Sequence, residues 1–345
     1  MHKLSLFFCL SLFIHSYCFA QTAKDSAKTK QNISNSGFKE YYPIHEKPSI
    51  MWSSNLVSFE PIFFEAKPTV YYSISNNMRY VMQNFAHKPS DAFYFTFQPH
   101  IRMYDEQSVP VKMPSYKVLA GWQRLVKTPR NNFFSFAVES GHFSNGQSGC
   151  TFDSTLVDES DACTALHATI TDSDNLSELL NRTNGNFSTN LTKLSLNFRV
   201  NRFGQNNTPF ISHSFSGAYT LFHNKLFGLI DKGGFSDFDI GIYGRHRFEL
   251  DYEYIHTYAG KFRYSLGINT EFIERPHPSV EPWRVELFIT VYPFKINDLA
   301  FFVKYNHGHD DYNIRFVDSG NQFSVGAVWD WFKPFEIKRA EVLEN

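Results

Sequence analysis

The stretch from Asp239 to Ile255, DIGIYGRHRFELDYEYI, decides the fold class because its residues alternate with a period of two. Its even positions are mostly apolar or aromatic, and its odd positions carry charges of both signs, such as Arg247 and Glu253. Successive side chains of a β-strand point to opposite faces of the sheet. The stretch therefore predicts a strand with one apolar face and one charged face.

Other segments alternate in the same way, among them 262–272, 283–291 and 323–331. From residue 67 onward, roughly eleven such segments can be distinguished, and no long stretch has helical periodicity. Single-chain barrels of outer membranes usually have an even number of strands, because each hairpin returns the chain to the same side. The pattern therefore predicts about twelve strands, with ten as the alternative.

The composition agrees with such strands and excludes several other classes of protein. The chain has 345 residues, of which 42% are hydrophobic, and its formal net charge is −1. This apolar content excludes a mostly disordered chain, and the balanced charge gives no basic surface for nucleic acid. A soluble β-sandwich would alternate too. The strand lengths and the aromatic residues near the strand ends favour an all-β, transmembrane, antiparallel up-and-down β-barrel.

The N-terminus predicts export to an outer membrane. A short basic start at 1–3 precedes an apolar stretch at 4–14, which is too short to span a bilayer, and Ala20 precedes an expected cleavage site. We therefore expect a signal peptide at 1–20 and a flexible, periplasmic N-terminal segment at 21–66. The barrel is expected at 67–332, with a long loop insertion at 147–187 and a C-terminal tail at 333–345.

The insertion holds both cysteines that would remain after cleavage, Cys150 and Cys163. In an exported chain this pair predicts a disulfide bond. The insertion also carries an acidic run, which could cover a site, supply oxygen ligands to calcium or form a solvated extracellular loop. The run comprises Asp153, Asp158, Glu159, Asp161, Asp172 and Asp174.

The stretch 131–149, NNFFSFAVESGHFSNGQSG, carries the candidate chemistry. Glu139 is its one charge, so the odd positions are expected to face a polar lumen and the even positions to face lipid. His142 and Ser144 then lie on the lipid side at i and i+2, within reach of an imidazole–hydroxyl hydrogen bond. Asn190 opens the next expected strand with the same orientation and lies beside them in a hairpin.

Three polar side chains on a lipid-facing side need a reason, because hydrocarbon offers them no hydrogen-bonding partners. One interpretation is a hydrolase in which Ser144 is the nucleophile, His142 the general base and Asn190 the group that orients the imidazole. The other is that these residues only mark the polar end of a strand at the headgroup level.

The run His142-Phe143-Ser144-Asn145-Gly146 resembles the H-x-S-N-G signature of the outer membrane phospholipase A family. Asn190 matches the family's third catalytic residue, and 304–326 is similar to its last hairpin. The resemblance implies a twelve-stranded barrel that hydrolyses acyl ester bonds of membrane phospholipids. It also implies dependence on calcium (Ca2+) and a possible homodimer.

Two features depart from the family pattern. Ser144 and Asn190 are separated by 45 residues, whereas the family has a short loop there. The positions after the signature, 147–149, read Gln-Ser-Gly without the family's Arg and Asp, so the metal ligands cannot be assigned. A lipid A deacylase and a non-catalytic barrel or porin therefore remain alternatives.

Two further polar clusters occur in the sequence. His307 and His309, followed by Asp310 and Asp311, could form a metal cluster, but we favour the interpretation of a polar loop end in a barrel hairpin. The arginines of the run Arg245-His246-Arg247 are expected to pair with carboxylates in the lumen.

Overall fold

The protein is described here by a computed structural model, in which residues 49–53, 62–73, 90–105, 111, 113–127, 132–203, 209–258, 262–293 and 299–329 can be described. The expected signal peptide, the expected N-terminal segment up to residue 48 and the expected C-terminal tail lie outside these residues.

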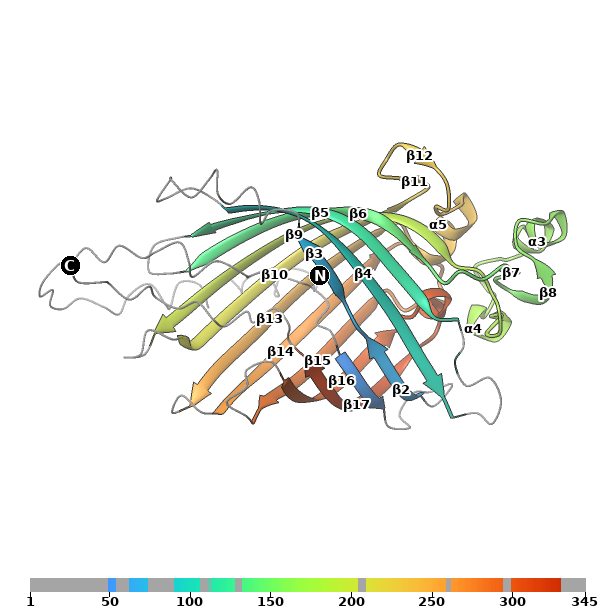
Figure 1. Ribbon diagram of the computed structural model, residues 1–345. Coiled ribbons are helices and arrows are strands. Elements are labelled where there is room, and N and C mark those ends of the chain that lie inside the picture. The colour runs from blue at the N-terminus through green and yellow to red at the C-terminus, as the bar shows by residue number, and fades with distance from the viewer. Residues whose placement is uncertain are drawn as a thin grey trace, which may run out of the picture. The chain divides into compact units, whose positions relative to one another are not determined.

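The described residues form one antiparallel sheet of 13 strands, which is the wall of the barrel (Figure 1). Its strands, in chain order, are β1 (Ser49–Ser53), β2 (Ile62–Lys67), β3 (Val70–Ser73), β4 (Ser90–Tyr104), β5 (Ser115–Lys127), β6 (Phe133–Ser144), β9 (Ser188–Phe203), β10 (Pro209–His223), β13 (His246–Tyr258), β14 (Phe262–Glu274), β15 (Trp283–Tyr292), β16 (Leu299–His309) and β17 (Ser319–Trp329).

From β4 to β17, each strand pairs with the next wall strand in the sequence, and β1 pairs with β17 and with β2. β2 also pairs with β4, which brings the two ends of the sheet together. Since β2 and β3 both lie along β4, they share one position in the wall, and the 13 strands occupy twelve positions. The predicted up-and-down β-barrel of about twelve strands is confirmed. The predicted start at residue 67 is too late, because β1 and β2 precede it.

The two faces of the wall differ as the alternation predicts. On β9, inward-facing Ser195, Asn197 and Arg199 are buried, and the apolar residues between them are exposed on the outer face. The exposed fractions of these outer residues are 41% for Leu194, 49% for Leu196 and 40% for Phe198. An apolar outer face with a polar interior is the arrangement that membrane-spanning strands require.

Short elements connect the strands at one end of the barrel (Figure 1). None of the helices in the described residues is long and apolar enough to cross a membrane. These connecting elements are β7 (Gly149–Cys150), β8 (Asp153–Val157), α3 (Asp161–His167), α4 (Leu176–Leu179), β11 (Lys225–Leu226), β12 (Ile230–Asp231), α5 (Asp237–Tyr243) and the 3-10 helix η3 (Asn313–Val317).

One of these helices corrects the predicted strand 239–255. Ser236 and Asp239 form a capping box that starts α5, and Gly244, with φ 70°, ends it. Strand β13 therefore begins at His246. Arg247 pairs with Glu271 in the interior as predicted, at 2.9 Å, but Arg245 lies exposed in the preceding bend. The prediction of lumen pairing is therefore wrong for Arg245.

The connecting elements pack against one another in an apolar core at this end of the barrel. Residues from five connections and from the adjoining strand ends contribute to it: Met113, Leu119, Phe143, Phe152, Leu176, Leu180, Phe187, Leu191, Phe222, Phe235, Ile242, Tyr243, Ile273, Val280, Ile314, Phe316 and Val317. Burial of large side chains contributes about 1.5–3 kcal/mol each, so this core holds the connections in place.

The insertion at 147–187 is folded, and Cys150 and Cys163 form the predicted disulfide. Three side chains of its acidic run, those of Asp153, Asp158 and Asp174, accept local hydrogen bonds. The Thr155 hydroxyl and amide donate to Asp153 and lower the pKa of that carboxyl, and the Thr171 amide does the same for Asp174. The acidic residues involved are therefore part of a folded loop.

Candidate active site

Strand pairing brings the three predicted site residues to one place on the outer face of the wall. His142 on β6 lies directly opposite Asn190 on β9, and Ser144 lies opposite Ser188. On the other side of β6, Tyr116 of β5 is opposite Ser144. The inward neighbour Phe143 is 2% exposed and belongs to the apolar core, whereas His142 and Ser144 are half-buried on the outer side. The alternation of β6 therefore agrees with the expected lipid-facing orientation.

Asn190 holds the His142 ring in a defined state. The Asn190 Oδ1 atom is 3.0 Å from His142 Nδ1, and Asn190 Nδ2 donates to two backbone carbonyls, at 3.1 Å to Asn224 O and 2.7 Å to Lys232 O. Because both amide protons are used by carbonyls, the oxygen must face the imidazole and accept the proton on Nδ1. In the neutral imidazole, the other ring nitrogen, Nε2, is then the acceptor.

The Ser144 hydroxyl makes no hydrogen bond with His142 among the contacts of the described residues. The expected hydrogen bond is therefore not formed in this structure. The two residues nevertheless share one face of β6 at a spacing of about 6.6 Å between Cα atoms, as i and i+2 positions of a strand do. Catalytic hydrogen bonds are often long in unliganded enzymes and tighten only when the substrate is bound.

The turn after Ser144 is held by a buried asparagine. Asn145 Nδ2 donates to Gly185 O at 2.7 Å, and its Oδ1 accepts from the amide of Phe187 at 3.0 Å. This ties the turn to the end of the insertion. The exposed Gly146 follows with φ 66°, and its N–H has no hydrogen-bonding partner in the described part of the chain. An N–H without a protein partner is available to donate to a bound group.

A second group of residues completes the site from the connection between β10 and β13. Ser188 Oγ donates to Gly233 O at 2.7 Å. A Cβ atom placed on Gly233 would lie 2.9 Å from His142 Cε1, so the glycine backbone packs directly against the imidazole. Sequence reasoning missed Asn224, Lys232 and Gly233, because the first two act through backbone carbonyls. The Gly233-Gly234 pair was the only sequence signal of a close backbone approach.

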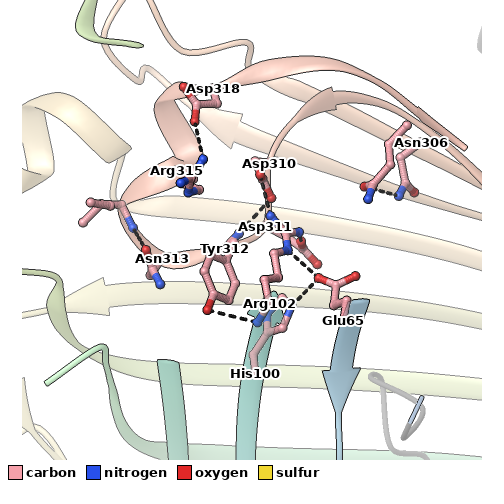
Figure 2. Close-up of polar contacts among 12 residues, drawn as sticks. Glu65, His100, Arg102, Asn306, Asp310, Asp311, Tyr312, Asn313, Arg315 and Asp318 are labelled. Atoms are coloured by element: carbon pink, nitrogen blue, oxygen red, sulfur yellow. Dashed lines mark hydrogen bonds and ion pairs between the residues drawn. The ribbon is translucent and has the colours of Figure 1, made fainter. Parts of the chain in front are cut away.

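The described residues contain two groups of potential metal ligands, and neither includes Ser144 or His142. The first is Glu65, His100 and Asp311 in the lumen, shown in Figure 2. These carboxylates already pair with cations. Arg102 contacts Glu65 at 2.6 Å and Asp311 at 2.9 Å, and Lys67 also contacts Asp311. The group is therefore a salt-bridge network rather than a site for a metal ion.

The second group is Cys150, Cys163 and His167 in the insertion. The two sulfur atoms are joined in the disulfide, so they offer no thiolate to a metal.

The alternative of a metal cluster at His307 and His309 is not supported either. Gly308, with φ 117°, interrupts the alternation, so that His307 lies exposed beside Asn321 while His309 is buried beside Glu271. The polar loop-end interpretation holds for Asp310 and Asp311, which enter the lumen network through Arg102 (Figure 2).

No family model matches the chain, and no curated protein matches it. Among solved structures, it is similar to outer membrane phospholipase A from Escherichia coli, with a TM-score of 0.49, 10% identity, and coverage of 84% of this chain and 97% of that one. The calcium-bound dimer of the Salmonella typhi outer membrane phospholipase has a TM-score of 0.49 and 8% identity, and the alignment covers 85% of this chain and 92% of that one.

A porin, NanC, is also similar, with a TM-score of 0.38, 10% identity, and coverage of 82% of this chain and 99% of the porin. These similarities assign no activity to the chain. Its function has to be inferred from its own side chains.

Proposed function

We propose that this protein is an outer membrane phospholipase of the A1/A2 type, with Ser144 as nucleophile, His142 as general base and Asn190 as the residue that orients the imidazole. The observation that carries the proposal is the hydrogen bonding of Asn190. It fixes the proton on Nδ1 of His142 and leaves Nε2 free, on the same outer face as Ser144.

The reaction follows from these positions. The Ser144 oxygen attacks the carbonyl carbon of an acyl ester while its proton passes to His142 Nε2, and the Gly146 N–H donates to the resulting oxyanion. The bond to the glycerol oxygen then breaks, and Nε2 returns the proton to that leaving oxygen. Water repeats the sequence on the acyl-serine, which releases a fatty acid and restores the hydroxyl.

The surroundings of the site favour a lipid as the substrate. Tyr116 and Val118 flank it on β5, and Leu194 extends the outer face of β9 below it, all of them exposed. Acyl chains lying in the bilayer against the wall would contact these residues while the ester linkage, at the headgroup level, reaches Ser144.

Dependence on calcium and formation of a homodimer are implied by the family resemblance, and the geometry of the site does not itself point to either. No cluster of three or more carboxylate, His or Cys ligands surrounds Ser144 in the part of the chain that the structure describes. Ser188 lies opposite Ser144 across the β6–β9 pair, and its hydroxyl alone is a poor site for a hard cation that takes about six to eight oxygen ligands. The steps above therefore involve only groups of this chain.

The test is active-site labelling with a fluorophosphonate, followed by fatty-acid release from phospholipid in detergent micelles. Ser144→Ala is expected to abolish both while the barrel stays folded. Ser140→Ala is the matched control, because Ser140 lies on the same strand and face but donates to Leu191 O at 3.0 Å. Unchanged release from the Ser144 variant contradicts the proposal.

The two alternatives are distinguished by separate observations. A lipid A deacylase would change the mass spectrum of lipid A when the protein is expressed, whereas a phospholipase would not. A passive pore is disfavoured by the apolar core and the salt-bridge network, which occupy the barrel at the end of the connecting elements. Single-channel conductance without esterase activity would reverse this conclusion.

A further inference from the structure

The β11–β12 hairpin (Lys225–Asp231) exposes a cluster of large apolar side chains next to the candidate site. The exposed fractions are 47% for Phe227, 83% for Leu229 and 50% for Ile230. Such a cluster at the tip of a hairpin is typical of an interaction surface rather than of a soluble loop. None of these residues belongs to the apolar core at the end of the barrel.

The base of the hairpin is attached to the outer side of the wall. Asn190 donates to Asn224 O and Lys232 O on either side of it, and Ser188 donates to Gly233 O. These serine and asparagine side chains lie opposite Ser144 and His142, which face outward. The hairpin therefore lies on the lipid side of the wall, continuous with the apolar outer face.

We infer that the β11–β12 hairpin inserts its apolar tip into the outer leaflet of the membrane and so holds the adjoining lipid at the level of Ser144. The anchoring stands on the geometry of the hairpin. Its effect on hydrolysis rests on the proposed function.

Part of the hairpin's backbone is hydrogen-bonded internally, which lowers the cost of placing it in an apolar environment. The amides of Gly228 and Leu229 donate to Lys225 O and Leu226 O, each at 3.0 Å, and the amide of Lys232 donates to Ile230 O at 3.0 Å. Backbone groups that enter hydrocarbon without partners would cost several kcal/mol each.

The charges of the hairpin lie at its base rather than its tip. Lys225 is paired in register with Asp231, and Lys232 follows it, all three exposed. This order, apolar at the tip and charged at the base, matches a headgroup layer above an acyl layer. Lys232 leaves a net positive charge at the level of anionic headgroups.

Anchoring can be measured without any enzyme activity. Leu229→Cys, carrying an environment-sensitive fluorophore, is reconstituted into phosphatidylcholine–phosphatidylglycerol vesicles whose acyl chains are brominated. The matched site is Val157→Cys on β8, which is 64% exposed at the same end of the barrel. We expect quenching at 229 to exceed that at 157 by about twofold or more. Equal quenching overturns the inference.

A second copy of the chain is the other possible occupant of the tip. It would shield the fluorophore in proportion to the protein-to-lipid ratio and without bromine quenching, and this outcome also overturns the inference.

The effect on hydrolysis is measured with the double variant Leu229→Asp/Ile230→Asp. We expect a loss of roughly tenfold on phospholipid vesicles, because two acidic side chains oppose insertion, with turnover of a water-soluble short-chain ester within about twofold of wild type. Val157→Asp should change neither rate. If the double variant hydrolyses vesicles at the wild-type rate, or loses equal activity on vesicles and on the short-chain ester, the inferred effect of the hairpin on hydrolysis is wrong. If the wild-type protein hydrolyses neither substrate, the proposed function fails while the quenching result still decides the anchoring.

Discussion

Replacement of Asn190 by aspartate tests the central argument most directly, because many catalytic triads have a carboxylate at this position. In this structure the amide group of Asn190 is fully buried and donates to Asn224 O and Lys232 O. A carboxylate has the same shape but no proton to donate at neutral pH. In the Asn190→Asp variant, one carboxylate oxygen would face two carbonyl oxygens without a hydrogen between them.

The cost follows from the two lost hydrogen bonds. A typical hydrogen bond contributes about 0.5–1.5 kcal/mol, so the loss of both lowers the free energy of unfolding by about 1–3 kcal/mol, to which the burial of a charge adds. The carboxylate also turns away from the carbonyls, so that the His142 ring is no longer held. We expect kcat to fall by up to about 10⁴-fold, the loss that follows when the orienting group of a serine triad no longer holds the histidine.

The assay is fatty-acid release from phospholipid micelles, with urea unfolding followed by tryptophan fluorescence on the same samples. Asn190→Ala is the comparison, because it removes the orienting oxygen without introducing a charge. We expect it to be less active than wild type but more stable than Asn190→Asp. Equal or higher kcat in Asn190→Asp, with unchanged unfolding, would refute the reasoning that the two carbonyls fix the amide.

Two further predictions follow from the contacts described above. Gly233→Ala places a Cβ atom 2.9 Å from His142 Cε1 in a backbone with φ 62°, and we expect about tenfold slower hydrolysis with an intact barrel. Asp311→Asn removes a partner of Arg102 from the lumen network, and we expect the free energy of unfolding to fall by about 3 kcal/mol with hydrolysis unchanged. Fatty-acid release and urea unfolding check both.

Each of these has a control. Gly241→Ala in α5 is matched to the glycine variant, since a Cβ there meets no atom within 4 Å, and it should hydrolyse like wild type. Wild-type activity in Gly233→Ala would show that the β10–β13 connection does not position the imidazole. An Asp311→Asn variant that unfolds like wild type would show that the network contributes little to stability.

The fold and the common face of the three candidate residues could be predicted, because both depend on the period-two pattern. Alternation assigns a face to every residue of a strand, and this placed His142, Ser144 and Asn190 on one side. The same pattern failed at 239–243, where a Ser-x-x-Asp start at Ser236 and a glycine at Gly244 form a helix instead. The capping pattern was a signal for this helix in the sequence, but the apolar even positions masked it.

What sequence reasoning could not find was the contribution of backbone atoms. Asn224 and Lys232 bind Asn190 through carbonyl groups, which every residue has, so no residue type marks them. The expectation that His307 and His309 share one face of the strand failed for a related reason. A single left-handed glycine, Gly308, reversed the alternation between them.

The salt-bridge network has a consequence for how the barrel is assembled. Glu65 lies on β2, near the beginning of the wall, and Asp310 and Asp311 precede β17, its last strand, while Arg102 on β4 contacts all three. These charges can neutralise one another only when the first and last strands are both in place. A chain that lacks its final hairpin would leave Arg102 with Glu65 alone, without its contacts to Asp310 and Asp311. The ends of the sheet join and the lumen charges become fully paired in the same step. Incomplete pairing therefore destabilises partly assembled barrels.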